Sequence, residues 1–174
     1  MNIAELGKYR TIYADPPWLE TGGGRIRRGA DRHYPLMKTR DIASLPISSI
    51  ALDNSHLYLW TTNRFLPNAL EVVRAWGFEY RTMITWLKDR IGLGQYYRGM
   101  TEHCLFAVRG VLPYRTRPDG KRAQGVTGFT ATRGAHSVKP EEMREMIELV
   151  SYAPRIELFA RCPADGWDVW GNEI

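Results

Sequence analysis

Features that would quickly assign a chain to a secreted or membrane class are missing from this sequence. Only two cysteines occur, Cys104 and Cys162, and they show no CxxC or zinc-type spacing. No apolar run approaches the roughly 18 residues of a membrane-spanning helix, and the opening segment MNIAELGKYR lacks the apolar centre of a secretion signal. We therefore expect a protein of the reducing cytoplasm that does not enter a membrane.

The motifs of several common enzyme classes are missing as well. The glycine-rich segment 21–30 matches neither GxGxxG nor GxxxxGK[ST], which argues against nucleotide hydrolysis. The four histidines show no HExxH or paired Cys/His spacing, so no metal site is expected. His103, within an apolar run, is interpreted as a core residue. No GxSxG nucleophile elbow occurs.

What the sequence does contain is basic charge, most of it on arginine. Of the 24 Lys and Arg residues 19 are arginine, and the formal net charge is +5. The planar arginine side chain suits phosphate groups and base edges, so a nucleic acid is a candidate partner. One basic cluster spans 109–122, and another comprises Arg25, Arg27, Arg28 and Arg32. Composition alone leaves open that both are solvated loops.

The order of the apolar segments predicts a single α/β domain, 1–174. Aromatic and β-branched residues predict strands at 9–14, 56–62, 80–87, 102–109 and 155–160, with a short extension at 167–171. Apolar residues at helical spacing predict one helix with Pro67 in its first turn and a second helix that Pro140 opens. The segment between the first two strands is expected to be irregular, and 113–128 to be a mobile loop. This alternation favours a mostly parallel sheet with helices on both faces.

One short segment stands where such folds place their ligands. Asp15, Pro16, Pro17 and Trp18 directly follow the first predicted strand, and ligands of α/β folds bind beyond the carboxyl ends of strands. Consecutive prolines stiffen the backbone and remove two N–H donors, which is expected to leave carbonyl groups as free acceptors.

This segment suits the chemistry of an exocyclic amine such as that of adenine. Asp15 and the Pro16 carbonyl can accept its two N–H groups and orient the nitrogen towards an electrophile. Trp18 offers a flat surface on which a base can stack. The alternative interpretation is a turn with an exposed aspartate and a core tryptophan.

At these residues the sequence resembles the MT-A family, named for the 70-kDa subunit of the messenger-RNA adenosine methyltransferase and shared with small bacterial and phage adenine methyltransferases. The resemblance covers nearly the whole chain, and the ordered set of motifs is more specific than DPPW alone. The set comprises ADPPW (14–18), LYLWTTNR (57–64), ITWLK (84–88), EHCLFAVRG (102–110), HSVKPEEMREMIE (136–148), RIELFAR (155–161) and WGNE (170–173).

The resemblance implies a Rossmann-like, class I S-adenosylmethionine-dependent methyltransferase of circularly permuted order, with the catalytic motif first. The implied catalytic residues are Asp15, Pro16, Pro17 and Trp18. The implied cofactor-binding residues are Asp15, Lys139, Phe159, Arg161, Asn172 and Glu173, with Lys139 paired to the methionine carboxylate. The candidate substrate-binding residues are Tyr34, which the family places near base and cofactor, and Arg25, Arg27, Arg28 and Arg32.

Some features of the sequence depart from the family or have simpler explanations. Larger members use an aspartate ahead of the first strand to hold the cofactor adenine, and this chain shows no obvious counterpart. Glu173 stands where larger members have glutamine. Weak cofactor affinity is therefore expected. Taken singly, Lys139 can be a surface lysine and Phe159 a core residue.

These observations lead to a hypothesis for the function. The chain is expected to transfer methyl from S-adenosylmethionine to the N(6) amine of adenine in nucleic acid, with DNA favoured over RNA, after the base leaves the duplex. The alternatives are an RNA adenine methyltransferase, a methyltransferase acting on cytosine N(4) or a protein amide, and a catalytically silent nucleic-acid-binding subunit. A homodimer or a heteromeric partner subunit remains open, as does the recognition sequence.

Overall fold

The computed structural model describes residues 2–19, 36–132 and 138–171. They form a seven-stranded sheet of order β5-β3-β4-β2-β1-β6-β7. The strands are β1 (Tyr9–Ala14), β2 (Ala51–Thr61), β3 (Glu79–Lys88), β4 (Thr101–Arg109), β5 (Gly128–Ala131), β6 (Arg155–Leu158) and β7 (Asp168–Trp170). The helices are α1 (Thr39–Ala43), α2 (Ile47–Ile50), α3 (Leu66–Ala75) and α4 (Glu141–Val150), with 3-10 turns η1 (Ile3–Glu5) and η3 (Asn63–Phe65).

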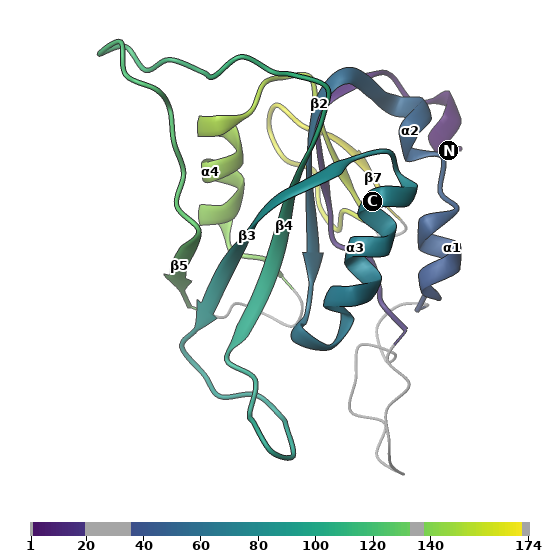
Figure 1. The fold of residues 1–174 in the computed structure, drawn as a ribbon, viewed down its shortest axis with the longest axis vertical. Coiled ribbons are helices and arrows are strands. Elements are labelled where there is room, and N and C mark those ends of the chain that lie inside the picture. The colour runs from purple at the N-terminus through teal and green to yellow at the C-terminus, as the bar shows by residue number, and fades with distance from the viewer. Residues whose placement is uncertain (1, 20–35, 133–137, 172–174) are drawn as a thin grey trace.

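The sheet is mostly parallel. Strand β4 runs antiparallel to its neighbours β2 and β3, whereas the other neighbouring strands pair in parallel. The predicted α/β fold with a mostly parallel sheet is confirmed, and the circularly permuted order stays a prediction. All strands except β4 therefore end at one edge of the sheet, where β4 begins. We call it the carboxyl edge, and it lies at the bottom of Figure 1.

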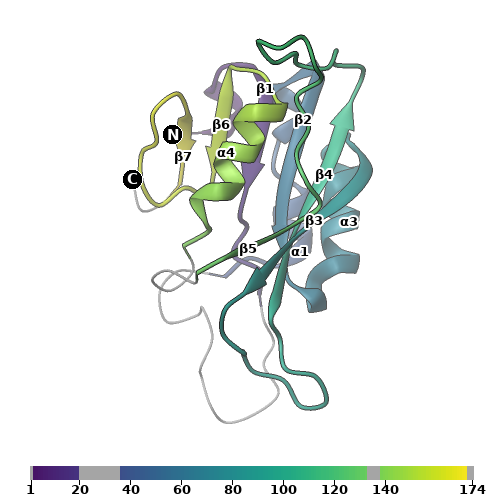
Figure 2. The same ribbon diagram turned by 90° about the vertical axis from the view of Figure 1, so that its left-hand side faces the viewer.

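Helices cover both faces of this sheet. Figures 1 and 2 show α1, α2 and α3 on one face and α4 on the other. Because successive side chains of a strand point to opposite faces, Ile12 joins the core cluster that includes residues of α3, and Tyr13 joins the cluster that includes residues of α4. Strand β1 and the second half of β2 are thus buried on both sides.

The two predicted helices form where they were expected. Helix α3 carries a proline in its first turn and buries Ala69, Val72 and Val73. Helix α4 follows Pro140 and buries Met143 and Ile147. Both helices therefore pack one apolar stripe against the sheet. No helix within the described residues is long and apolar enough to cross a membrane.

The sequence-based prediction missed three short elements. The segment between β1 and β2 is not wholly irregular, because α1 and α2 form there and bury Ile42, Ile47 and Ile50. Helices of five and four residues are too short to display a helical period. Strand β5 was not predicted either; it begins at Gly128, the last residue of the predicted loop, and pairs in parallel with β3. Its residues are exposed or half-buried, so the sequence there shows no apolar run.

Candidate active site

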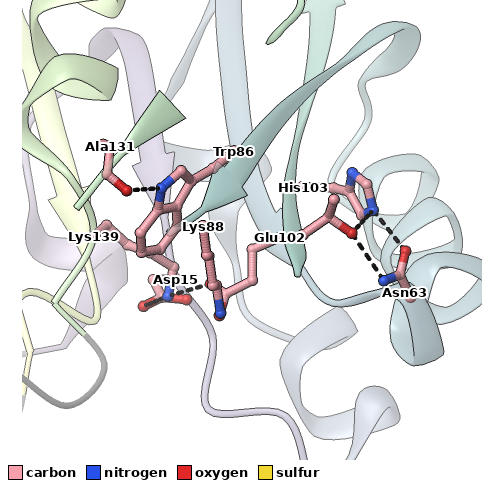
Figure 3. Close-up of polar contacts among 9 residues, drawn as sticks. Asp15, Asn63, Trp86, Lys88, Glu102, His103, Ala131 and Lys139 are labelled. Atoms are coloured by element: carbon pink, nitrogen blue, oxygen red, sulfur yellow. Dashed lines mark hydrogen bonds and ion pairs between the residues drawn. The ribbon is translucent and has the colours of Figure 1, made fainter. Parts of the chain in front are cut away.

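The carboxyl edge brings together charged side chains that lie far apart in the sequence. Asp15 directly follows β1, Lys88 ends β3 and Glu102 is the second residue of β4. Lys139 lies just before α4. Figure 3 shows these four side chains converging in front of the strand ends.

The four groups form a chain of alternating charge. Lys139 Nζ lies 2.6 Å from Asp15 Oδ2 and 3.5 Å from Glu102 Oε2. Lys88 Nζ donates a hydrogen bond to Glu102 Oε1. The exposed fractions of the four side chains are only 16% to 23%. Because partly desolvated charges interact more strongly than charges in water, these contacts fix the direction in which the Asp15 carboxylate points.

The pKa values of two carboxylates in this region, Glu102 and Glu157, are shifted in opposite directions. Burial raises the pKa of Glu102, but the ammonium groups of Lys139 and Lys88 outweigh it and hold the pKa below its ordinary value. For Glu157 of β6 burial dominates, and the pKa is raised although Arg144 donates a 2.8 Å hydrogen bond to it. Glu102 therefore keeps its negative charge to a lower pH than an ordinary glutamate does.

Aromatic rings form part of the surroundings of this charged chain. Lys139 Nζ lies 5.3 Å from the ring centroid of Trp60, and Lys88 Nζ lies 5.1 Å from that of Trp86. The indole of Trp86 donates to the Ala131 carbonyl at 2.9 Å, which holds the ring in place (Figure 3). Cations are attracted to the faces of such rings, so the tryptophans help to position both ammonium groups.

The proline segment is fixed by hydrogen bonds, and one expectation about it was wrong. The carbonyls of Pro16 and Pro17 are not free, because they accept hydrogen bonds from Trp18 N at 2.9 Å and Met37 N at 2.8 Å. Prolines lack donors, but the residues around them supply N–H groups that fold back. A carbonyl oxygen has two lone pairs, so each oxygen retains the capacity for a second bond.

Trp18 lies in the core rather than on an open surface. Its side chain is 8% exposed, its indole N–H donates to the Trp60 carbonyl at 3.0 Å, and its ring stacks on Phe65 with centroids 5.7 Å apart. This placement fits the alternative interpretation of Trp18 as a core residue. It gives no support to the expected stacking on a base, because the ring is already packed.

The end of β6 carries an unusual backbone next to Asp15. Phe159 has a φ of 61° and is the one non-glycine residue with positive φ among the described residues. Such conformations are uncommon for non-glycine residues and gather at functional sites. Its ring packs edge-on against Trp170 at 5.5 Å. Arg161 follows two residues later, so Phe159 and Arg161, two of the predicted cofactor residues, lie just beyond the end of β6 at the carboxyl edge. Asp15 is adjacent, because its backbone N–H donates to the Leu158 carbonyl.

Other predicted site residues cannot be placed in this way. The residues Tyr34, Arg25, Arg27, Arg28, Arg32, Asn172 and Glu173 lie outside the described residues. The basic cluster 109–122 begins at the far end of β4, at the top of Figure 1. There Arg115 donates to the carbonyls of Glu148 and Ser151 at the end of α4. Its placement gives no support to a phosphate contact beside Asp15.

Sequence reasoning assigned no role to Lys88 and Glu102. Both stand within motifs quoted for the resemblance, and the antiparallel pairing of β3 with β4 sets Trp86 opposite Glu102. A charged residue at the end of an apolar strand was the available signal. His103 is a buried residue, as interpreted, and its ring nitrogens lie 2.7 Å from Asn63 Oδ1 and 3.0 Å from Thr85 Oγ1.

A cavity of about 510 Å³ lies away from these charges. It is formed between the segment 110–127, strands β3 and β4, and α4, and its lining includes His56, Phe106 and Met146. Burial lowers the pKa of His56 to about 4, so its imidazole is neutral at neutral pH. The described residues contain no cluster of three metal-binding groups. We therefore place the candidate site at the carboxyl edge and not in this cavity, because the charged groups of Asp15, Lys139 and Glu102 meet at that edge.

Comparisons with known proteins give matches that cover nearly the whole chain. The family model MT-A70 matches residues 9–173. The chain is 33% identical over 188 residues to the Type II methyltransferase M.MunI of Mycoplasma sp, covering 96% of this chain and 78% of that protein. It is 29% identical to the human N(6)-adenosine-methyltransferase catalytic subunit METTL3 and 28% identical to an MT-A70-like N(6)-adenosine-methyltransferase of Arabidopsis thaliana. It spans only 30% and 24% of the lengths of these two proteins.

Proposed function

Because this chain belongs to the MT-A70 family, we propose that it transfers a methyl group from S-adenosylmethionine to the exocyclic N(6) amine of adenine in DNA. The names of its relatives support methyl transfer, and those of the longer relatives specify N(6)-adenosine. Its similarity to a Type II methyltransferase over most of both chains supports DNA as the substrate.

The observation that carries this proposal is the Asp15 carboxylate at the end of β1, aimed by Lys139 at 2.6 Å. The adenine amine is a poor nucleophile because its lone pair is delocalised into the ring. A fixed carboxylate and a backbone carbonyl that accept its N–H groups direct the nitrogen and stabilise the positive charge that develops on it. Asp15 and the remaining lone pair of the Pro16 carbonyl can supply these acceptors.

The residues at the carboxyl edge suit a cofactor that carries both signs of charge. When bound, S-adenosylmethionine would supply the methyl group on a cationic sulfur, which would leave as the neutral thioether of S-adenosylhomocysteine, and the methylated amine would lose one proton to Asp15 or to water. Lys139 is the candidate partner for its carboxylate, and Phe159 and Arg161 stand at the neighbouring strand end. An ammonium has three N–H donors, so Lys139 could bind this carboxylate and still hold Asp15 in the orientation that the adenine amine requires.

The adenine must leave a duplex to reach Asp15, because in the duplex one N–H of its amine is paired with thymine and the stacked neighbouring bases block the approach to the nitrogen. A single strand removes this requirement. Arg25, Arg27, Arg28 and Arg32 are the proposed phosphate contacts, with Tyr34 near the base. The net charge of +5 favours the approach of a polyanion.

The test is methyl transfer from labelled S-adenosylmethionine to DNA and RNA oligonucleotides, followed by digestion and identification of the labelled nucleoside. We expect N(6)-methyladenine in DNA. Asp15→Asn should reduce transfer at least about a thousandfold in a protein that is still folded, with a lower melting temperature because the ion pair with Lys139 is lost. Asp53→Asn, an exposed substitution in β2, should change neither. Label on RNA alone, on cytosine or on protein would contradict the proposed substrate, and activity in Asp15→Asn would contradict the mechanism.

A further inference from the structure

The connection between β3 and β4 carries large side chains that the fold does not bury. We call residues 89–100 the β3–β4 hairpin, and Figure 1 shows it projecting beyond the carboxyl edge. Tyr96 and Tyr97 are each 93% exposed, and Leu93 is 75% exposed. Exposed apolar groups that lie next to one another commonly mark a binding surface.

The hairpin has a defined shape. Gly92 N donates to Gly99 O at 2.7 Å and Gly99 N donates to Leu93 O at 3.1 Å, which ties its two arms together. Arg98 Nε adds a bond to the Gly92 carbonyl at 2.9 Å. A Cβ atom at Gly94 would lie 1.9 Å from the Tyr97 carbonyl oxygen, so that position requires glycine. The close approach of the two arms turns the tyrosines outward.

The base of the hairpin is part of the candidate active site. Lys88 N donates to Met100 O at 2.8 Å and closes the hairpin, while the Lys88 ammonium contacts Glu102. Glu102 in turn lies 3.5 Å from Lys139, which holds Asp15. The hairpin that bears Tyr96 and Tyr97 therefore follows directly after Lys88, one of the charged residues grouped around Asp15.

We propose that Tyr96 and Tyr97 stack on bases of the nucleic acid next to the adenine that enters the site. This inference rests on the proposed function. A target base that leaves its stack exposes the faces of its neighbours, and aromatic side chains stack on such faces without regard to sequence. Tyrosine suits this role because its ring is flat and its hydroxyl stays hydrated while the ring is exposed.

Charge favours a nucleic acid over a second copy of this chain as the partner of the hairpin. Arg90 and Arg98 accompany the tyrosines, opposed by Asp89 alone. Two copies that each carry a net charge of +5 repel one another, whereas a polyanion is attracted.

The test is the affinity for a fluorescein-labelled DNA single strand and for the matching duplex, measured by anisotropy at one salt concentration without cofactor. The double variant Tyr96→Ala/Tyr97→Ala should bind the single strand at least about tenfold more weakly. The double substitution to phenylalanine should restore the affinity, and the double substitution to leucine should not, because leucine keeps apolar area without a ring. Tyr80→Ala, at the opposite end of β3, is the matched control. Thermal melting confirms that each variant is folded.

The outcomes separate this inference from the proposed function. If wild type methylates adenine but the alanine variant binds and methylates DNA normally, the inference is overturned and the function stands. If binding depends on the rings but no nucleoside is methylated, the function fails and the stacking role stands. If sedimentation shows that wild type self-associates through the tyrosines and DNA affinity is unchanged, the hairpin belongs to a protein contact and the inference is overturned.

Discussion

Lys139 Nζ lies 2.6 Å from the Asp15 carboxylate although 124 positions separate the two residues in the sequence. The contact exists because Asp15 follows β1 while Lys139 precedes α4, and both ends meet at the carboxyl edge. Glu102 is a second acceptor for the same ammonium, at 3.5 Å. Lys139 therefore lies between two carboxylates, and a ligand that binds its ammonium group changes the electrostatic surroundings of both Asp15 and Glu102.

The first prediction concerns the different roles of the two lysines in this chain. Lys139→Met should weaken S-adenosylmethionine binding at least about tenfold, because it removes the proposed partner of the cofactor carboxylate and a charge-assisted hydrogen bond. Lys88→Met should leave cofactor binding within about threefold, because Lys88 contacts Glu102 and not Asp15. Isothermal titration calorimetry measures both. Equal losses in the two variants would show that the lysines act as one unit, which contradicts a specific contact at Lys139.

The second prediction concerns acid sensitivity and follows from the lowered pKa of Glu102. A carboxylate with a folded-state pKa below its unfolded value stabilises the fold above the unfolded pKa, and this stabilisation is lost as the pH falls through the folded pKa. The difference in unfolding free energy between wild type and Glu102→Gln should therefore shrink as the pH is lowered from 7 to about 3.

Urea unfolding of the two proteins across this pH range measures that difference. Glu157, whose pKa is raised, acts in the opposite sense but is present in both proteins, so its contribution cancels. A difference that stays constant with pH would mean that Glu102 has the same pKa in the folded and unfolded states. Glu142→Gln, on the exposed first turn of α4, is a suitable control.

The predicted strands and helices formed largely because their signals are local. Proline in the first turn and an apolar stripe mark α3 in the sequence itself. The charged chain around Asp15 is different, since it depends on which strands become neighbours. Lys88 and Glu102 meet only because β3 and β4 pair in the register that sets Leu87 opposite Thr101. No local pattern of residues specifies that register.

The interpretation of Trp18 shows a similar limit to local reasoning. An aromatic residue beside an aspartate suggested stacking on a base, and its position after a strand agreed with this. The acceptor of its indole N–H is the Trp60 carbonyl at the end of β2, which the sequence around Trp18 does not reveal. Burial of the ring was decided by that partner and by Phe65.

The third prediction tests this placement directly. Trp18→Phe keeps an aromatic ring but loses the buried hydrogen bond to the Trp60 carbonyl and part of the core volume. The free energy of unfolding should fall by about 1–3 kcal/mol. The affinity for an oligonucleotide should stay within about twofold, since a packed ring offers no stacking surface. Unchanged stability together with a large loss of oligonucleotide affinity would show that Trp18 contacts the substrate, as the sequence had suggested.

The last prediction concerns the close approach of β7 to the end of β6. A Cβ atom at Gly171 would lie 2.1 Å from the Ala160 carbonyl oxygen, a distance that no side chain tolerates. Gly171→Ala should therefore separate the two strands, lower the free energy of unfolding by about 1–3 kcal/mol and weaken cofactor binding, because Phe159 packs on Trp170 at this junction. Gly128→Ala is the matched control, since its Cβ would meet Thr85 O at an ordinary 3.9 Å. Chemical denaturation and calorimetry measure the two effects, and a Gly171→Ala protein with wild-type cofactor affinity would exclude this junction from the cofactor site.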